Sequence, residues 1–232
     1  MAGSQSGGKP SLTAAMTVNT DIIILHTTKV GENSLVIHTL SREYGRRGFL
    51  VRSLGKRMPA SFFLPMNVLE ANINESSRST LYTIRDLTPK HSLIGIRNNI
   101  LKNAITMFIS EVLYRVIKDG TNEQGLFDWC EKEILILDDM GAGFNNFHIR
   151  FLMELCIILG FSPDSHGLAP FAGDRMETMD RFLKASFEEA MMIPLTGAVR
   201  NEIAEDLLRY IEFHSESSVN VKSLQVLREL FR

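Results

Sequence analysis

The sequence has few of the residues that build disulfide or metal scaffolds. Its 232 residues include only two cysteines, Cys130 and Cys156, and no CxxC or HxxxH pair. Structural zinc sites typically show closely spaced Cys or His pairs, so the six scattered histidines predict no metal site and no cofactor. Both cysteines lie in apolar, helix-like surroundings. We interpret them as reduced core thiols, with a single disulfide as the alternative.

A membrane span and a secretory leader are also missing. The longest apolar run, residues 151–161, is interrupted by Glu154 and is far shorter than the roughly 20 residues that a membrane helix needs. The N-terminus has no charged flank followed by an apolar core. Residues 1–19 are rich in Gly, Ser and Ala, so we expect a disordered extension or a tag. These features favour a cytoplasmic protein with no membrane partner.

Catalytic signatures are absent as well. The sequence contains no Walker-type loop, no GxSxG motif and no nucleophile paired with a base. Asp138 and Asp139 precede a Gly-rich turn, and paired carboxylates can bind Mg²⁺ for phosphoryl chemistry. The alternative is a polar helix end. We expect no enzyme and keep a metal-dependent nucleic-acid enzyme using these two residues as an alternative.

The sequence is rich in positive charge only locally. The formal net charge is −2, yet residues 17–89 carry nine Lys or Arg against six Asp or Glu, and residues 90–232 carry fifteen against twenty-one. Residues 41–57 gather six cations against one acid. A basic front and an acidic rear indicate two surfaces with different partners.

Hydrophobic periodicity predicts a β part followed by an α part. Five short apolar or alternating runs, divided by Gly, Asn and Ser turns, predict strands at 21–28, 34–41, 48–54, 67–74 and 80–87. Five such strands predict a small closed sheet. The expected fold class is α+β: a five-stranded barrel of the oligonucleotide-binding (OB) type at residues 20–89 and an all-α C-terminal domain at residues 90–232.

Apolar residues at spacings of three and four begin after Pro89. They predict helices at about 96–120, 123–138, 144–160, 176–190 and 197–213, and a last one ending at Phe231. Residues 144–160 are apolar on most faces and should form the central helix. Residues 166–178 are expected to form a loop.

The basic run falls on a strand end, a turn and the next strand. Period-2 alternation places Arg47 on one face with Phe49 and Val51, and Arg52 on the other face with Leu50. Arginines beside aromatic residues are typical of surfaces that follow a phosphate backbone and stack bases. The alternative is a solvated barrel rim, in which case the protein is a protein-interaction module.

The order of these motifs resembles the RecO family of bacterial recombination mediators. Residues 21–57, "DIIILHTTKVGENSLVIHTLSREYGRRGFLVRSLGKR", are similar to the opening of that family. Further similarity lies in "FFLPMNVLEANI", in "FLMELCIILGFSPD" and in the tail "NVKSLQVLREL". One departure is clear: many members carry a four-Cys zinc module after "LGF.P", and here residues 160–178 contain no cysteine.

The resemblance implies a DNA repair and recombination protein with an OB fold that is associated with the nucleoid. Such proteins bind single- and double-stranded DNA, anneal complementary strands, and help load the recombinase RecA onto DNA covered by single-strand-binding protein (SSB). They work with RecR, and their helical domain grips the acidic, Phe-ended tail of SSB.

The resemblance also implies roles for particular residues. The predicted phosphate contacts are Arg42, Arg46, Arg47, Arg52, Lys56, Arg57, Arg78 and Arg85. The predicted cations for the SSB tail, each also open to being an ordinary surface charge, are Arg115, Lys118 and Lys132.

Overall fold

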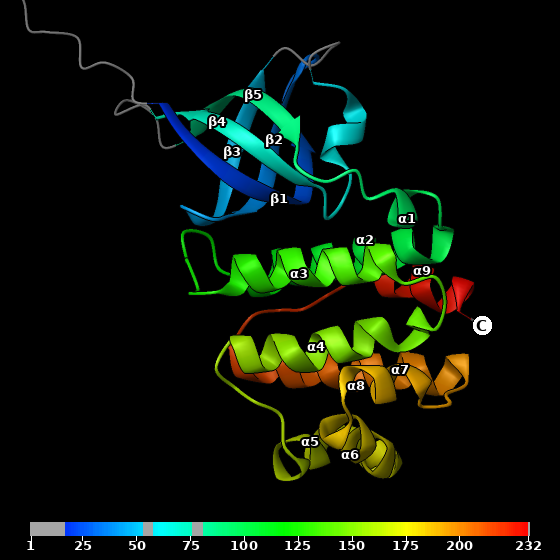
Figure 1. Ribbon diagram of the computed structural model, residues 1–232. Helices are drawn as coiled ribbons and strands as arrows, with labels where there is room; N and C mark the ends of the chain where they lie inside the picture. Colours follow the sequence, from blue (N-terminus) through cyan, green and yellow to red (C-terminus); the bar gives the residue numbers. More distant parts are fainter. Residues whose placement is uncertain (1–16, 53–57, 76–80, 232) are drawn as a thin grey trace, which may run out of the picture.

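The computed structural model describes residues 17–52, 58–75 and 81–231, which form a β-barrel and a stack of helices. In Figure 1 the barrel lies at the top and the helices lie in layers beneath it. The predicted fold class, a five-stranded barrel followed by an all-helical part, is confirmed. No helix in the described ranges is long and apolar enough to cross a membrane.

The barrel closes in the order β1-β2-β3-β5-β4. Neighbouring strands are antiparallel except at the closure, where β3 and β5 run parallel. Alternation along β3 turns Phe49 and Val51 into a fully buried interior. The strands are β1 (Thr17–Lys29), β2 (Ser34–Ser41), β3 (Gly45–Arg52), β4 (Val68–Asn74) and β5 (Tyr82–Pro89).

β1 is longer than predicted because it pairs with two neighbouring strands along different parts of its length. Residues 17–23 pair with β4, and residues 22–29 pair with β2. The register shifts between Ile24 and His26, and such a bulge bends a strand so that it can turn from one partner to the next. The polar start of β1 has no apolar alternation, so its pairing with β4 could not be predicted from the sequence.

The helical part is built around α4, as its apolar sequence predicts. Phe151, Leu152 and Leu155 of α4 are fully buried, and the helix contacts α2, α3, α7 and α8. The helices are α1 (Ile94–Arg97), α2 (Ile100–Val116), α3 (Leu126–Asp139), α4 (Phe147–Ile158), α5 (Ser165–Ala172), α6 (Met176–Lys184), α7 (Phe187–Met192), α8 (Gly197–Ser215) and α9 (Ser223–Leu230).

Two predicted helices are each divided in two. The helix expected at 96–120 is broken because the Asn99 side chain caps α2, accepting hydrogen bonds from the N–H groups of Leu101 and Lys102. The helix expected at 176–190 is broken because Ser186 and Glu189 form a capping box that starts α7. In both places a side-chain cap satisfies the backbone groups of a new helix start.

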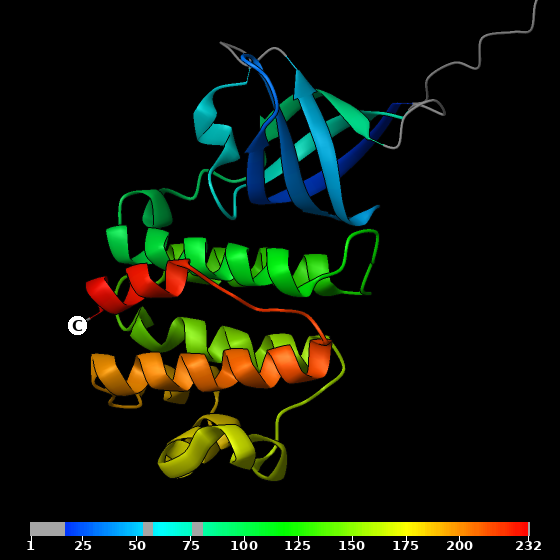
Figure 2. The same cartoon turned by 180° about the vertical axis from the view of Figure 1, so that it is seen from behind.

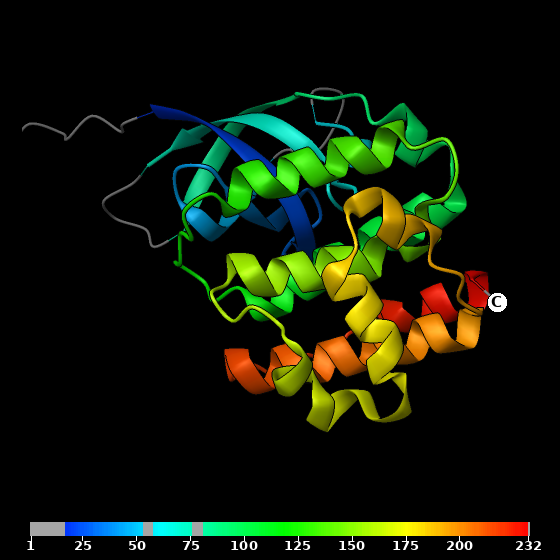
Figure 3. The same ribbon diagram turned by 60° about the horizontal axis from the view of Figure 1, so that its bottom comes forward.

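The loop predicted at 166–178 is wrong, because α5 and the start of α6 lie there (Figure 3). The Asp164 side chain caps α5 by accepting from the Gly167 N–H at 2.7 Å. Pro170 lies inside the helix and removes one backbone hydrogen bond, while Leu168 and Ala172 bury completely. This burial offsets the lost bond, and it cannot be read from the local sequence.

The barrel rests on α2 through the outer faces of β1 and β2 (Figure 2). The rings of His26 and His38 lie 4.8 and 5.1 Å from the Tyr114 ring, measured between centroids. Burial lowers the pKa of both histidines, with Arg115 adding to the effect at His26 and Arg46 at His38. Beside these rings, Ile23, Leu25 and Leu40 of the outer barrel face are buried in the same apolar cluster as the helices, which holds the two layers together.

Candidate nucleic-acid interface

The cations of the basic run do not form one surface. Arg42 and Arg46 face the helices, Arg47 lies at one end of the barrel, and Arg52 lies on the outer face of the barrel. Three further predicted contacts, Lys56, Arg57 and Arg78, lie outside the described residues.

Arg42 belongs to an ion-pair network between the barrel and α3. Its guanidinium pairs with Asp21 of β1 and with Asp128 and Glu131 of α3. It also lies 4.4 Å from the centroid of the Phe127 ring. Glu131 in turn accepts hydrogen bonds from Lys90 and His91, which lower its pKa despite the opposing effect of burial. The geometry therefore favours a structural role for Arg42.

Arg46 is buried at the junction between β3 and the loop that joins α2 to α3. Its Nη1 contacts Asp119 Oδ1 at 2.5 Å, and its guanidinium lies 4.6 Å from the Tyr114 ring centroid. The backbone of Arg46 donates to the Thr121 carbonyl and accepts from the Gly120 N–H. Strand β3 is thereby fastened to the helical part at its first residues.

Arg47 lies over aromatic rings at one end of the barrel. Its guanidinium is 4.0 Å from the Tyr82 ring centroid and 5.6 Å from that of Tyr44. The Tyr44 hydroxyl donates to Glu75, and burial together with this hydrogen bond raises the Tyr44 pKa. The rings and the guanidinium form a partly exposed platform that can meet a base or a phosphate.

Arg52 and Arg85 lie side by side on the outside of the barrel. Val51 of β3 pairs with Ile84 of β5, and both side chains point into the barrel. Arg52 and Arg85 come directly after this pair on the two parallel strands, so alternation turns both away from the interior at neighbouring positions. Both are exposed. Barrel closure brings together two predicted site residues that are far apart in the sequence.

A cavity of about 420 Å³ lies where this outer face meets the loop between α2 and α3. It is lined by Val36, His38, Arg46, Arg47, Gly48, Leu81, Asp119 and Gly120. At Gly48 the side chains of Val36, His38 and Leu81 lie close around the β3 backbone, 3.5 to 3.7 Å from where a Cβ atom would be. Two arginines and an apolar wall are suited to a phosphate with its attached sugar or base.

The three cations predicted to bind a protein tail do not meet. Arg115 lines a cavity of about 320 Å³ between β1, α2 and α9, and Lys132 lines another on α3. Lys118 is an exposed residue beyond the end of α2. Each of these cations remains a predicted contact.

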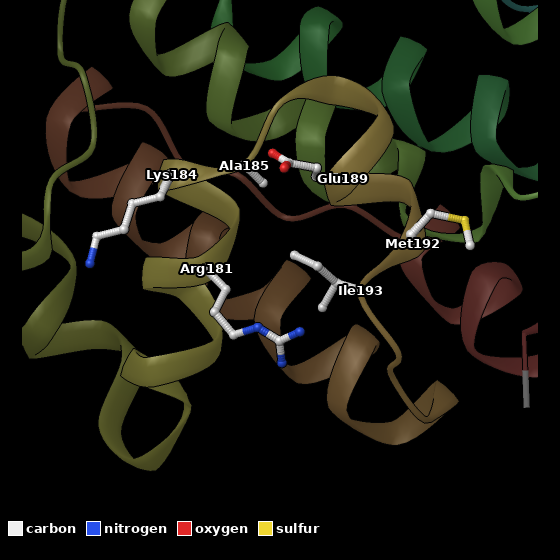
Figure 4. A pocket seen from close by; sticks show the side chains of 6 residues that line it. All are labelled: Arg181, Lys184, Ala185, Glu189, Met192 and Ile193. Atoms are coloured by element: carbon white, nitrogen blue, oxygen red, sulfur yellow. The ribbon is translucent and has the colours of Figure 1, made fainter.

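Sequence reasoning missed a cavity of about 500 Å³ between α6 and α7 (Figure 4). Helix α6 supplies Arg181 and Lys184, while Met192 and Ile193 supply an apolar side. Met192 is 78% exposed, which is unusual for so large an apolar side chain. The available signal was the strong amphipathicity of α6, with its two cations three residues apart.

The two acids of the enzyme alternative have separate surroundings. Asp138 Oδ1 accepts the Ile96 N–H at 2.7 Å, so this carboxylate fastens α1 to the end of α3. Asp139 is exposed and lines the same cavity as Lys132. Across residues 17–52, 58–75 and 81–231, no three His, Cys, Asp or Glu side chains gather where they could hold a metal.

Comparison with known proteins identifies the family. The family model for the recombination protein O N terminal domain matches residues 16–93, and that for the C terminal domain matches residues 97–169. The chain is 26% identical to the DNA repair protein RecO of Phocaeicola vulgatus, over 90% of this chain and 97% of that protein. It is 27% identical to the DNA repair protein RecO of Christiangramia forsetii, over 93% of this chain and 100% of that protein. The sequence therefore belongs to the RecO family of DNA repair proteins.

Proposed function

We propose that this protein is a non-catalytic mediator of DNA repair that binds DNA on the outer face of β3 and β5. The observation that carries the proposal is the exposed pair Arg52 and Arg85 on the outer face. Arg47 and its tyrosine rings lie at one end of the barrel, on the other side of β3 from Arg52, and offer a second place for a base or a phosphate. Lys56, Arg57 and Arg78 follow or precede these strands in the chain and remain predicted contacts.

This arrangement suits binding without sequence choice. Cations on a β surface neutralise phosphates, and phosphate contacts give affinity and salt dependence but read no bases. The rings of Tyr44 and Tyr82 can stack any base, because every base has a π-face. A repair mediator must act wherever damage occurs, so a surface of this kind fits the need.

Strand annealing requires no bond-making group. A basic surface lowers the repulsion between two strands and holds their bases unpaired until they meet. The family's loading of RecA and its partnership with RecR would be served by the remaining surfaces of the helical part. The acidic balance of residues 90–232 is consistent with protein contacts there rather than DNA contacts.

Binding of a fluorescent single-stranded oligonucleotide across a salt series tests the proposal. Wild type should bind at low salt, with log affinity falling linearly against log salt. Arg52→Ala/Arg85→Ala should lose about 1.4 units of that slope, since each contact on a single strand contributes roughly 0.7. Arg181→Ala/Lys184→Ala removes the same charge from the helical part and should keep the slope of the wild type.

Three results would contradict it. Wild type that binds no DNA at low salt would favour the protein-interaction alternative. Annealing that stops when EDTA removes divalent metal would favour the enzyme alternative with Asp138 and Asp139. An equal loss in both double variants would show that net charge, not the β3–β5 surface, governs binding.

For the SSB tail, we propose the cavity of Figure 4 as the docking place. An acidic peptide that ends in Phe needs cations for its carboxylates and an apolar hollow for its ring. Arg181 and Lys184 provide the first, and Met192 and Ile193 provide the second. Glu189 lies on the rim, but its carboxylate is already engaged with the Ser186 N–H.

The same two double variants test this site, with their expected effects exchanged. A synthetic acidic peptide ending in Phe should lose affinity for Arg181→Ala/Lys184→Ala and keep it for Arg52→Ala/Arg85→Ala. If instead Arg115→Ala or Lys132→Ala removes peptide binding and the α6 variant does not, one of the cations predicted from the sequence marks the site.

A further inference from the structure

An acidic side chain of the protein itself closes one side of the cavity at Arg46. Asp119 follows α2 and lines that cavity together with Arg46 and Arg47. Its carboxylate contacts Arg46 Nη1 at 2.5 Å. The Asp119 carboxylate is thus an anion that lies where this part of the interface would bind a DNA phosphate.

The two partners differ sharply in their exposure. The Arg46 side chain is only 9% exposed, whereas that of Asp119 is 70% exposed. Arg46 is further held by the Tyr114 ring, and its Nε lacks a hydrogen-bond partner among the described residues. The guanidinium is therefore fixed in position and retains an unused donor.

Asp119 is held much less firmly than Arg46. Within the described residues, its carboxylate makes no hydrogen bond or ion pair except the one to Arg46. The neighbouring backbone is fastened separately, because the Gly120 N–H donates to the Arg46 carbonyl at 2.8 Å. The Asp119 side chain can therefore rotate into water while the loop keeps its place.

We propose that Asp119 occupies the position of a DNA phosphate on Arg46, and that a bound strand displaces this carboxylate. This inference rests on the proposed DNA-binding function and adds a step to it. In the free protein the carboxylate neutralises a buried cation, and in the complex a phosphodiester does so.

The physical balance favours such an exchange. An ion pair with one well-exposed member contributes little stability, since water solvates the acid almost as well. A buried guanidinium without any anion would be costly, so Arg46 needs a partner in both states. A phosphate offers more acceptor oxygens than the single one that Asp119 uses, and it carries the negative charge that the guanidinium needs.

The path of the strand follows from β3. The residues at positions 46, 48, 50 and 52 point to the same side of β3, so the outer face leads from Arg46 past Gly48 and Leu50 to Arg52. The exchange would place the DNA against the loop that joins α2 to α3.

The test compares Asp119→Asn with Glu43→Gln. Both variants remove one negative charge, and Glu43 lies only three residues before Arg46 in the chain. Glu43 is exposed, however, and its carboxylate has no ion pair within the described residues. Affinity for a fluorescent oligodeoxythymidine is measured by anisotropy at low salt. Without the competing carboxylate, Asp119→Asn should bind about threefold or more tightly than Glu43→Gln. Thermal unfolding confirms that both variants fold.

The outcomes separate this inference from the function on which it rests. Equal gains for the two variants, or a loss for Asp119→Asn, overturn the exchange and leave DNA binding by Arg52 and Arg85 intact. If neither the wild type nor any variant binds the oligonucleotide, the proposed function falls and the exchange falls with it. A larger gain for Asp119→Asn that disappears in Asp119→Asn/Arg46→Lys assigns the effect to the guanidinium.

Discussion

A Cβ atom on Gly45 would lie 2.0 Å from the carbonyl oxygen of Thr121. Gly45 opens β3, and Thr121 belongs to the loop between α2 and α3. The close approach allows the Arg46 N–H to donate to that same carbonyl at 2.9 Å. Glycine is needed here because any side chain would push the barrel away from the helical part.

Gly45→Ala should therefore destabilise the protein strongly. Gly45 has φ of +62°, and the added methyl group meets backbone rather than a flexible side chain. We expect a loss of at least about 3 kcal/mol in the free energy of unfolding. Gly120→Ala is the matched control, since Gly120 has φ of +81° and nothing within 4 Å of its added Cβ. Chemical denaturation measures both, and equal losses would mean that only the backbone angle matters.

Replacing Arg42 should affect mainly stability, whereas replacing Arg52 should affect mainly DNA binding. Arg42→Ala breaks the contacts with Asp21, Asp128 and Glu131 across the junction, so it should cost about 1–2 kcal/mol of stability. Arg52→Ala, at an exposed position, should change stability by less than about 0.5 kcal/mol. In DNA titrations the order should reverse, with only Arg52→Ala lowering the salt slope by roughly 0.7.

Denaturation curves and salt titrations on the same two preparations check this prediction. If Arg42→Ala lowers the salt slope as much as Arg52→Ala does, then Arg42 contacts phosphate, as the family resemblance implies. If Arg42→Ala instead loses stability and keeps the salt slope of the wild type, Arg42 has a structural role between the barrel and α3.

The thiols of Cys130 and Cys156 should be unreactive in the native protein. Both are free and buried, as predicted from their apolar surroundings. Burial raises the pKa of Cys130 and raises that of Cys156 to about 12, so almost no thiolate forms at neutral pH. Ellman's reagent should label neither thiol until urea unfolds the chain. Rapid labelling of either in native buffer would contradict the packing of α3 or α4.

Local sequence was sufficient to locate the five strands, but not to predict the start of β1 or the contacts between distant segments. The alternation of β2 marks its bounds, residues 34–41, because one face is buried. The position of Arg85 beside Arg52 depends on barrel closure between β3 and β5, which no local pattern records. The pairing of Arg46 with Asp119 depends on how the barrel rests on α2, so a buried arginine had the same local signature as an exposed one.

Glu133 should make the stability of the protein fall as the pH rises. This glutamate of α3 is 4% exposed, and burial, reinforced by the nearby charge of Glu154, raises its pKa to about 7. The folded state therefore holds a proton that the unfolded chain, with an ordinary pKa of 4.5, releases. This contribution is fully present below pH 4.5 and is lost as the pH rises through 7.

Glu133→Gln removes that loss, because the amide stays neutral at every pH. Relative to wild type, the variant should gain stability progressively between pH 4.5 and 7, reaching on the order of 2 kcal/mol above pH 7. Glu212→Gln, at an exposed position on α8, should shift the curve far less. Thermal unfolding at pH 5 and pH 8 measures the difference. A gain at pH 8 no larger than at pH 5 would mean that Glu133 is already ionised in the folded state, with water or a cation reaching it between α3 and its neighbours.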